Sequence, residues 1–317
     1  MSVVGSLNLF EAANHRGLDM NSYRSGFIAI AGRPNVGKST LLNRLMGQKV
    51  SIVSPRPQTT RAKIMGIKNL PGAQLIFLDT PGIDKSGGYF HRLMVKTAMN
   101  SLEGADLILW MVEATDPLSH DDKLILEIMR SVKLPILLAI NKVDLVEKER
   151  LLPTIDRFRA LLPFAEIVPI SAAEGDNVAL LESLLVQYLP EGQPLYPLDQ
   201  FTDQPERFTI AELIRERVFR LVYQEVPYAV AVLVEQVRRR EGRALTDVEA
   251  TIYVEKDSQK AIIIGRGGAM LKKIGELARP EIEKLLGTQV FLKLWVKVRS
   301  DWQTDDEALK RLGYLQS

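Results

Sequence analysis

A short run of residues near the N-terminus has the types and spacing needed to bind phosphate. Residues 32–39 read GRPNVGKS, which fits the pattern G-x-x-x-x-G-K-[ST]. Glycines in such a loop let backbone N–H groups turn toward phosphate oxygens. We therefore expect Lys38 to reach the β- and γ-phosphates of a nucleoside phosphate and Ser39 to ligate Mg²⁺.

A second candidate group, Asp-Thr-Pro-Gly at 79–82, directly follows the apolar run 75–78. A carboxylate at the end of a strand can support Mg²⁺ directly or through water, and the N–H of Gly82 can donate to a γ-phosphate. Alone, the tetrapeptide is more typical of an ordinary turn. Because the tetrapeptide follows the phosphate loop at a suitable distance along the chain, we favour a role for Asp79 in supporting Mg²⁺. The next residue, Ile83, cannot polarise water, so we expect slow intrinsic hydrolysis.

Residues 141–144 read Asn-Lys-Val-Asp and predict the base. An ionised aspartate only accepts hydrogen bonds, so Asp144 can accept from N1–H and the N2 amino group of guanine, a donor pair that adenine lacks. Asn141 would donate toward the other edge of the base, and the stem of Lys142 would cover the ring. The alternative is a helix start capped by Asp144. We expect GTP and GDP as the nucleotides.

Small residues at 171–173 follow another apolar run and would let a backbone N–H approach the guanine carbonyl. The expected nucleotide-binding set is Gly32, Arg33, Pro34, Asn35, Val36, Gly37, Lys38, Ser39, Thr40, Asp79, Thr80, Pro81, Gly82, Ile83, Asn141, Lys142, Val143, Asp144, Ser171, Ala172 and Ala173.

The stretch 53–61 contains two prolines and several polar residues, which is typical of a loop. One of its threonines is expected to move onto Mg²⁺ and the γ-phosphate when GTP is bound, and to release them after hydrolysis. We prefer Thr60 to Thr59, and a passive connection is the alternative. The expected metal ligands are therefore Ser39, Thr60 and Asp79.

A G-x-x-G tetrapeptide at 265–268 arises easily by chance, but its surroundings favour RNA binding. An apolar segment precedes it, an amphipathic pattern follows it, and residues 258–275 hold four basic residues and no acidic one. Such a loop can bring backbone N–H groups and an arginine against the phosphates of unpaired nucleotides. The alternative is a helix–turn–helix with a solvated basic face. The expected RNA-binding residues are Gly265, Arg266, Gly267, Gly268, Lys272 and Lys273.

The elements that must position these residues alternate between β-rich and helical patterns from 26 to 189. Such alternation predicts a doubly wound, mostly parallel α/β sheet with ligand loops at the carboxyl ends of the strands. The expected strands cover 27–31, 63–68, 74–78, 106–112, 135–140 and 166–170. The expected helices cover 38–46, 90–102, 119–131, 148–161 and 177–188.

The 317 residues predict two domains. We expect an N-terminal tail at 1–25, the nucleotide domain at 26–189, a Pro/Gly-rich linker at 190–205 and an α+β domain at 206–317. In the last of these we expect a helix and three strands, at 206–224, 229–234, 248–254 and 290–298.

Composition excludes some classes of site. The chain contains no cysteine, which excludes disulfides, thiolate metal sites and cysteine nucleophiles. The net charge of +2 does not by itself indicate nucleic-acid binding. The first 25 residues lack the long apolar core of a secretory signal, and no apolar run is long enough for a membrane span.

These motifs together resemble the Era family of bacterial GTPases. The resemblance rests on GRPNVGKS, Gln58-Thr59-Thr60-Arg61, Asp-Thr-Pro-Gly, Asn-Lys-Val-Asp, Val226-Pro227-Tyr228 and the C-terminal Ile-Gly-Arg-x-Gly. It implies a P-loop GTPase domain followed by an α+β KH (type II) domain. It also implies binding to the 3′ end of 16S rRNA, assembly and maturation of the small (30S) ribosomal subunit, and a cytoplasmic, monomeric protein with peripheral association with the inner membrane.

The resemblance also implies a role for Asn35. Related GTPases with asparagine at this position of the phosphate loop can use K⁺ as a fixed positive charge, so K⁺ is an expected cofactor beside Mg²⁺. The residues expected to act on the reacting phosphate are then Asn35, Lys38, Thr60 and Gly82.

Two other classes of function remain as alternatives. In the first, the chain is a GTPase whose C-terminal module binds a protein or membrane partner instead of RNA. In the second, it is a metabolic phosphotransferase that uses the same phosphate loop, a reading that residues 141–144 disfavour.

Overall fold

The computed structural model describes residues 23–54, 56–84 and 87–315 of the chain. Residues 1–22 of the expected N-terminal tail lie outside this description. The chain forms two compact units. The first contains the residues through Ser51 together with Lys63–Asp203, and the second contains Ile52–Ala62 and Gln204–Ser317. The division therefore differs from the expected one, because a short internal segment belongs to the second unit.

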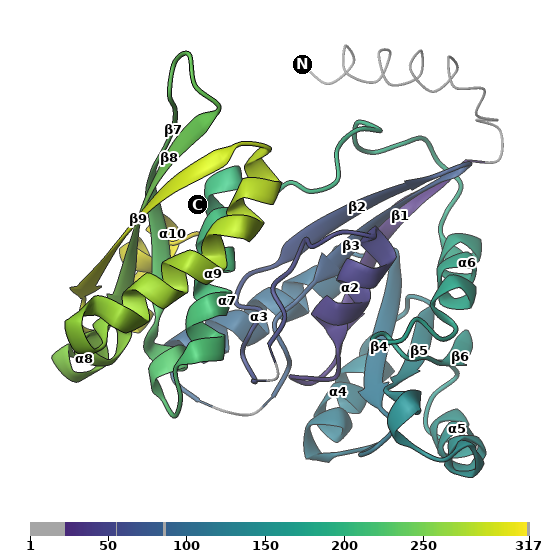
Figure 1. Cartoon of the computed structure of the whole chain (residues 1–317). Coiled ribbons are helices and arrows are strands. Elements are labelled where there is room, and N and C mark those ends of the chain that lie inside the picture. Colours follow the sequence, from purple (N-terminus) through teal and green to yellow (C-terminus); the bar gives the residue numbers. More distant parts are fainter. Residues whose placement is uncertain (1–22, 55, 85–86, 316–317) are drawn as a thin grey trace. The chain divides into compact units, whose positions relative to one another are not determined.

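The first unit is built on a six-stranded sheet in the order β2-β3-β1-β4-β5-β6 (Figure 1). β2 is antiparallel to β3, and the other neighbouring strands are parallel. The mostly parallel doubly wound sheet is confirmed. Its strands are β1 (Arg24–Ala31), β2 (Ile64–Leu70), β3 (Ala73–Asp79), β4 (Leu107–Glu113), β5 (Ile136–Asn141) and β6 (Glu166–Pro169).

Helices pack on both faces of this sheet, which explains why its central strands are almost continuously apolar. One face packs against α3 (Tyr89–Glu103), α4 (His120–Ser131) and α5 (Leu151–Arg159) through a shared apolar core. α2 (Lys38–Met46) and α6 (Val178–Tyr188) contact each other and β3. Each of these helices matches an expected one in position.

The stretch 190–203, expected as part of a free linker, packs along β2 and β3 of the first unit. The side-chain carbonyl of Gln74 accepts from the N–H groups of Leu195 at 2.7 Å and Tyr196 at 2.9 Å. The hydroxyl of Thr202 donates to a carbonyl of β2 at 2.7 Å. These bonds give partners to backbone N–H and C=O groups of the stretch and of β2. A proline-rich composition alone does not predict them.

The second unit contains a three-stranded sheet with one face covered by helices. β7 (Ala231–Arg239) is antiparallel to β8 (Leu245–Val254), and β9 (Gln289–Val298) is parallel to β8. The helices α7 (Glu206–Leu221), α8 (Asp257–Ile264) and α9 (Ala269–Leu286) share one apolar core with the sheet, and α10 (Asp306–Arg311) follows. The order α–β–β–α–α–β is the one expected for a type II KH module.

Arg61, which is only 2% exposed, anchors the segment Ile52–Ala62 in the second unit. Its guanidinium donates to the carbonyls of Val230 at 2.6 Å and Tyr228 at 2.9 Å. The same group lies over the ring of Phe219, 5.4 Å from its centre. Burial lowers the pKa of Arg61 to about 10, and the nearby positive charge of a second arginine adds to this effect.

That second arginine, Arg215 of α7, is fully buried and donates to the carbonyl of Thr59. Its Nε also donates to Glu212 at 2.7 Å. Burial disfavours the charge of Arg215, but Glu212, with help from Tyr314 and Glu216, raises the pKa of the guanidinium. The carboxylate of Glu216 accepts from the N–H of Val53 at 3.3 Å. Side chains of α7 therefore hold this segment at both ends.

Arg61→Met tests how much this anchor contributes to stability. The change keeps an unbranched side chain but leaves buried carbonyls without a donor, so we expect the free energy of unfolding of the second unit to fall by about 3 kcal/mol. Urea unfolding followed by fluorescence measures it. The control Arg243→Met, at an exposed position of the same unit, should change stability by less than about 0.5 kcal/mol. Equal effects of the two changes would contradict the assignment.

Candidate nucleotide-binding site

The phosphate loop connects β1 to α2 and is closely packed against the loop after β5. Gly37 has a φ of 101°, and a Cβ there would lie 2.3 Å from the side-chain nitrogen of Asn141. The N-terminus of α2 has no side-chain cap and no acidic residue in its first turn. An uncapped helix N-terminus is a ready site for an anion, because its N–H groups and its dipole both favour negative charge.

Lys38 lies buried at the start of α2, with its ammonium turned into the loop. Nζ donates to the carbonyls of Gly32 and Arg33, both at 3.0 Å. Burial lowers the pKa of Lys38 to about 8, although the nearby carboxylate of Asp79 partly opposes this shift. The loop therefore holds a cation in a position where phosphate oxygens would compensate for its lost hydration.

Hydroxyl and carboxylate groups meet at the expected metal site. The Ser39 hydroxyl lies 2.7 Å from Oδ2 of Asp79, and the Ser51 hydroxyl donates to the same oxygen at 2.9 Å. These are hard oxygen donors of the kind that Mg²⁺ prefers, and Mg²⁺ usually takes its other ligands from phosphates and water. Ser39 and Asp79 thus fit the ion, and Ser51 is a neighbour that the sequence pattern did not reveal.

The Asp-Thr-Pro-Gly segment lies against the phosphate loop. A Cβ at Gly82 would lie 2.6 Å from the nitrogen of Pro34, so only glycine allows this close approach. The hydroxyl of Thr80 donates to the carbonyl of Ile30 at 3.0 Å. Ile83 is 1% exposed and belongs to the apolar core, so its side chain is not placed to orient water.

Asn141, the last residue of β5, joins two loops through its buried side-chain amide. Nδ2 donates to the carbonyl of Val36 in the phosphate loop at 2.7 Å, and Oδ1 accepts from the N–H of Ala172 at 2.9 Å. Asn141 was expected to face the base. The structure adds a second role, because the same amide holds the phosphate loop and the loop at 171–173 together.

The loop at 171–173 is also held by Arg44 of α2. Nε of Arg44 donates to the carbonyl of Ala172 at 3.2 Å, and the guanidinium also bonds to the carbonyl of Ala173. Sequence reasoning missed Arg44, since an arginine near the end of a helix usually signals only a favourable interaction with the helix dipole.

Asp144 and Lys142, the other two side chains of the expected guanine site, have different surroundings. Asp144 is exposed, as an acceptor for a base must be before the nucleotide arrives. Nζ of Lys142 lies 2.7 Å from Oε2 of Glu113 at the end of β4. Glu113 was not among the predicted residues, because no motif marks the end of that strand.

The remaining predicted residues of the phosphate loop have different environments. Val36 is buried, Asn35 is exposed with a φ of 66°, and Pro34 and Thr40 are half-buried. The side chain of Arg33 turns toward carboxylates of the first unit. For Val36 and Arg33, only backbone groups are therefore expected to meet a phosphate.

Thr60 is 8% exposed and lies in the segment Ile52–Ala62 of the second unit. The other expected metal ligands, Ser39 and Asp79, belong to the first unit. Thr60 follows Thr59, whose carbonyl accepts from Arg215. A role for Thr60 at the metal therefore stays a prediction.

The expected RNA-binding loop joins α8 to α9 as a single 3-10 turn, Arg266–Gly268. Arg266, Lys272 and Lys273 lie at or beside this turn, and the two apolar side chains near them, Ile262 and Leu277, are 46% and 45% exposed. The side chain of Lys272 is largely exposed, and its Nζ lies 3.8 Å from the exposed carboxylate of Glu276. The loop thus presents cations and apolar surface together, which is the combination that single-stranded RNA requires.

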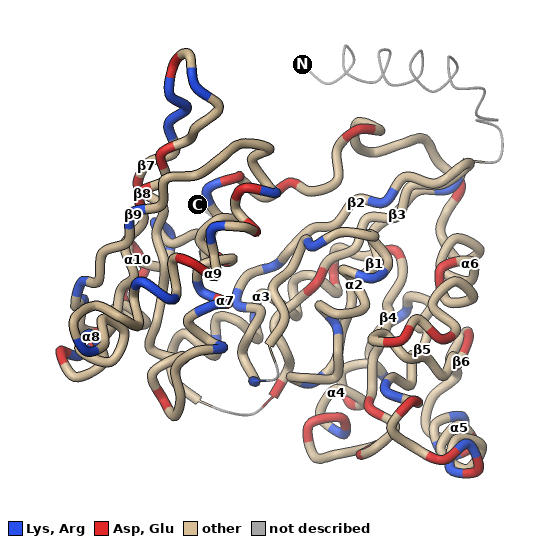
Figure 2. The backbone as a smooth tube through the Cα atoms, in the orientation of Figure 1, with Lys and Arg blue, Asp and Glu red and all other residues tan. Residues whose placement is uncertain are grey.

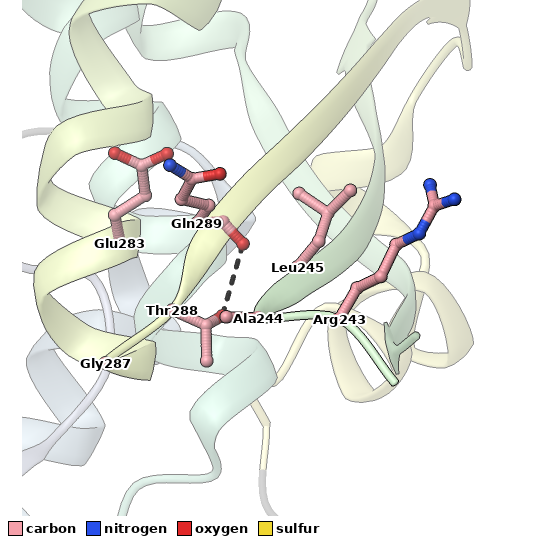
Figure 3. A pocket seen from close by; sticks show the side chains of 7 residues that line it. All are labelled: Arg243, Ala244, Leu245, Glu283, Gly287, Thr288 and Gln289. Atoms are coloured by element: carbon pink, nitrogen blue, oxygen red, sulfur yellow. Dashed lines mark hydrogen bonds between the residues drawn. The ribbon is translucent and has the colours of Figure 1, made fainter. Parts of the chain in front are cut away.

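The second unit has two other surface features, a basic hairpin end and an open hollow. Figure 2 shows basic residues along the projecting end of the β7–β8 hairpin, but Arg240 there is paired with Asp247 at 2.6 Å. Figure 3 shows an open hollow lined by Arg243, Ala244, Leu245, Glu283, Gly287, Thr288 and Gln289. Glu283 and Thr288 bond to neighbouring main-chain or hydroxyl groups there. Those two side chains serve the fold.

Two classes of feature are missing from the described ranges 23–54, 56–84 and 87–315. None of the helices in these ranges is long and apolar enough to cross a membrane. The same ranges contain no group of three or more histidine, cysteine, aspartate or glutamate side chains arranged to hold a metal ion. A Mg²⁺ ion at Ser39 and Asp79 would accordingly depend on phosphate oxygens and water.

The lowered pKa of Lys38 predicts that nucleotide affinity depends on pH. Negative phosphates favour the ammonium, so a bound nucleotide raises this pKa from its value of about 8. Binding then takes up a proton above that pH, and affinity falls as the pH rises. We expect the Kd for GDP to be roughly sixfold weaker at about pH 8.8 than at about pH 7.3.

Calorimetry in buffers of different ionisation enthalpy measures both the Kd and the protons taken up. A Kd that stays constant across the range, with no proton uptake, would refute the assignment to Lys38.

Comparison with known proteins supports both halves of this description. A family model described as a 50S ribosome-binding GTPase matches residues 27–142, and a KH domain model matches residues 225–303. The GTPase Era of Geobacter metallireducens is 52% identical over 294 residues, covering 93% of this chain and 99% of the relative. That of Geotalea uraniireducens is 50% identical and covers 92% and 98%.

Solved structures agree with these relatives. One structure of Era holds MgGDPNP and nucleotides 1506–1542 of 16S ribosomal RNA; it is 42% identical, with a TM-score of 0.90, and covers 93% of this chain and 100% of its own. A point variant of Aquifex aeolicus Era, bound to GDP·AlF4⁻, has a TM-score of 0.89 at 42% identity and covers 92% of this chain and 100% of its own. The chain therefore belongs to the Era family of GTPases, with a P-loop GTPase domain followed by a KH domain.

Proposed function

We propose that this GTPase is a molecular switch that binds the 3′ end of 16S rRNA and assists assembly and maturation of the small (30S) ribosomal subunit. The observation that carries the proposal is the likeness to an Era structure holding both MgGDPNP and a 16S rRNA fragment, which extends over 93% of this chain. A likeness across both domains supports coupling between nucleotide binding and RNA binding more strongly than a likeness of either domain alone would.

In this proposal the nucleotide binds between the phosphate loop and residues 141–144. Lys38 neutralises charge that develops on the phosphates during hydrolysis, and the N–H of Gly82 donates to the γ-phosphate. Asp144 accepts from guanine, and Lys142 covers the base. Supporting this placement are the exposed carboxylate of Asp144 and the turned-in ammonium of Lys38.

Mg²⁺ would be held by Ser39, supported by Asp79, and in the GTP state also by Thr60. When bound, the ion bridges phosphate oxygens and neutralises their charge. Because Thr60 lies in a segment anchored to α7 by Arg215, capture of Thr60 would pull on that anchor. We propose this segment as the route by which the GTP state reaches the KH domain.

The RNA would bind at the loop from Gly265 to Gly268, where Arg266 contacts phosphates, and the basic face of α9, with Lys272 and Lys273, would add further phosphate contacts. A Cβ at Gly267 or Gly268 would meet nothing within 4 Å, so substitutions can be placed there without a clash. Both positions have positive φ, which aspartate and asparagine tolerate better than most residues.

Filter binding of a short RNA with the 16S 3′-end sequence tests this site. Aspartate at Gly267 or Gly268 sets a negative charge against the RNA backbone, whereas asparagine has the same shape without the charge. We expect Gly267→Asp and Gly268→Asp each to weaken RNA binding at least about tenfold, and the asparagine variants to weaken it several-fold less.

The controls separate RNA binding from nucleotide binding. GDP affinity should be unchanged in all four variants, because the changes lie outside the first unit. If the native chain fails to bind this RNA, or binds it equally well in the aspartate variants, the alternative with a protein or membrane partner gains support. GTP turnover measured with and without the RNA then shows whether the two sites are coupled.

We further propose that K⁺ assists hydrolysis through Asn35. Its exposed position in the phosphate loop supports this, because a side-chain oxygen there can help hold a monovalent cation near developing charge. We expect turnover to be at least about tenfold faster in K⁺ than in Na⁺ at equal ionic strength, with Asn35→Ala losing the difference. Equal rates in the two salts would remove K⁺ from the proposal.

Family membership also supports a cytoplasmic location, peripheral association with the inner membrane and a monomeric state. Cell fractionation and sedimentation measure these three properties directly. The phosphotransferase alternative is disfavoured by the family, and a tight complex with ATP would restore it.

A further inference from the structure

The carboxylate of Glu113 lies between two motifs of the first unit. Glu113 ends β4 and is the register partner of Asn141 at the end of β5. Its Oε2 accepts from Nζ of Lys142 at 2.7 Å and lies 3.4 Å from Nη2 of Arg33. Its Oε1 accepts from the hydroxyl of Thr115. One carboxylate therefore contacts a cation of the phosphate loop and a cation of the expected guanine site.

The surroundings keep Glu113 charged and in place. Its side chain is only 16% exposed. Burial disfavours the charge, but the hydrogen bonds from Lys142 and Thr115, together with the positive charges of Lys142 and Arg33, hold the pKa of the carboxyl below its usual range. A charged, hydrogen-bonded carboxylate with little freedom to move can fix the position of a flexible lysine.

Arg33 gives this cluster a firm connection to the phosphate loop. Its Nε lies 3.3 Å from the fully buried carboxylate of Asp122, and its Nη2 lies 3.4 Å from Asp116. The guanidinium is thus held by carboxylates on more than one side. These ion pairs link Glu113, and through it Lys142, to a residue of the phosphate loop.

We propose that Glu113 is a positioning residue for guanine-nucleotide recognition. By holding the ammonium of Lys142, it extends the aliphatic stem of that lysine along the base subsite before the nucleotide arrives. Through Arg33 it ties this stem to the phosphate loop, so that the base and phosphate subsites are organised together. The inference rests on the nucleotide placement proposed above.

Glu113→Gln tests this role while keeping the size of the side chain. We expect the Kd for GDP and the KM for GTP to rise about tenfold, because Lys142 loses its charged anchor. The kcat should stay within about twofold, since the affected group does not touch the reacting phosphate. The matched control is Glu127→Gln, which removes an exposed carboxylate paired with Arg130 on α4 and should leave all three constants unchanged.

A double-mutant cycle separates positioning of Lys142 from a general structural effect. Lys142→Met keeps an apolar stem but has no ammonium, so adding Glu113→Gln to it should weaken GDP binding by less than about twofold. Additive losses, an unaltered Kd in Glu113→Gln alone, or a fall in kcat without a rise in KM would each overturn the inference. A native chain that binds no GDP would instead refute the proposed function itself.

Discussion

The nucleotide site depends on one buried side-chain amide, that of Asn141. It donates to the phosphate loop and accepts from the loop at 171–173. Both groups are main-chain atoms that would otherwise be buried without a partner, and such groups cost more free energy than a typical hydrogen bond gains. Asn141 is the last residue of β5, so the two loops proposed to bind phosphate and base take their positions from the sheet. Loops held in this way need little reorganisation when a nucleotide enters.

Buried cations form a second common feature of the two units. Lys38 and Arg61 are both almost fully buried, and main-chain carbonyls accept from each of them. Their environments differ in one respect. Arg61 lies among aromatic rings and carbonyls of the fold itself, whereas the carbonyls around Lys38 line a loop built to receive anions. The hydrogen bonds of buried Arg61 therefore stabilise the fold, whereas the buried ammonium of Lys38 is placed for an anion.

Much of this site could be predicted from the sequence, because its motifs depend on short spacings along the chain. The phosphate loop, Asp79 and residues 141–144 all lie where strand ends bring them, and the strands themselves are marked by continuous apolar runs. Glu113 and Arg44 were not predicted, because the residues they contact are distant in sequence and no local pattern marks them. The packing of 190–203 was missed for a related reason: prolines describe a local backbone preference, not the surface on which the stretch lies.

The segment Ile52–Ala62 limits where the chain can be cut into separate domains. The polypeptide leaves the first unit after Ser51, returns at Lys63 and leaves again after Asp203. The second unit is therefore discontinuous in sequence, although its KH elements are contiguous. A fragment beginning at Gln204 would lack the main-chain groups that meet Arg215 and Glu216. Two side chains that are fully buried in the whole chain would then each lose a main-chain partner. A fragment that keeps these contacts of the second unit therefore needs a peptide encoded inside the GTPase half.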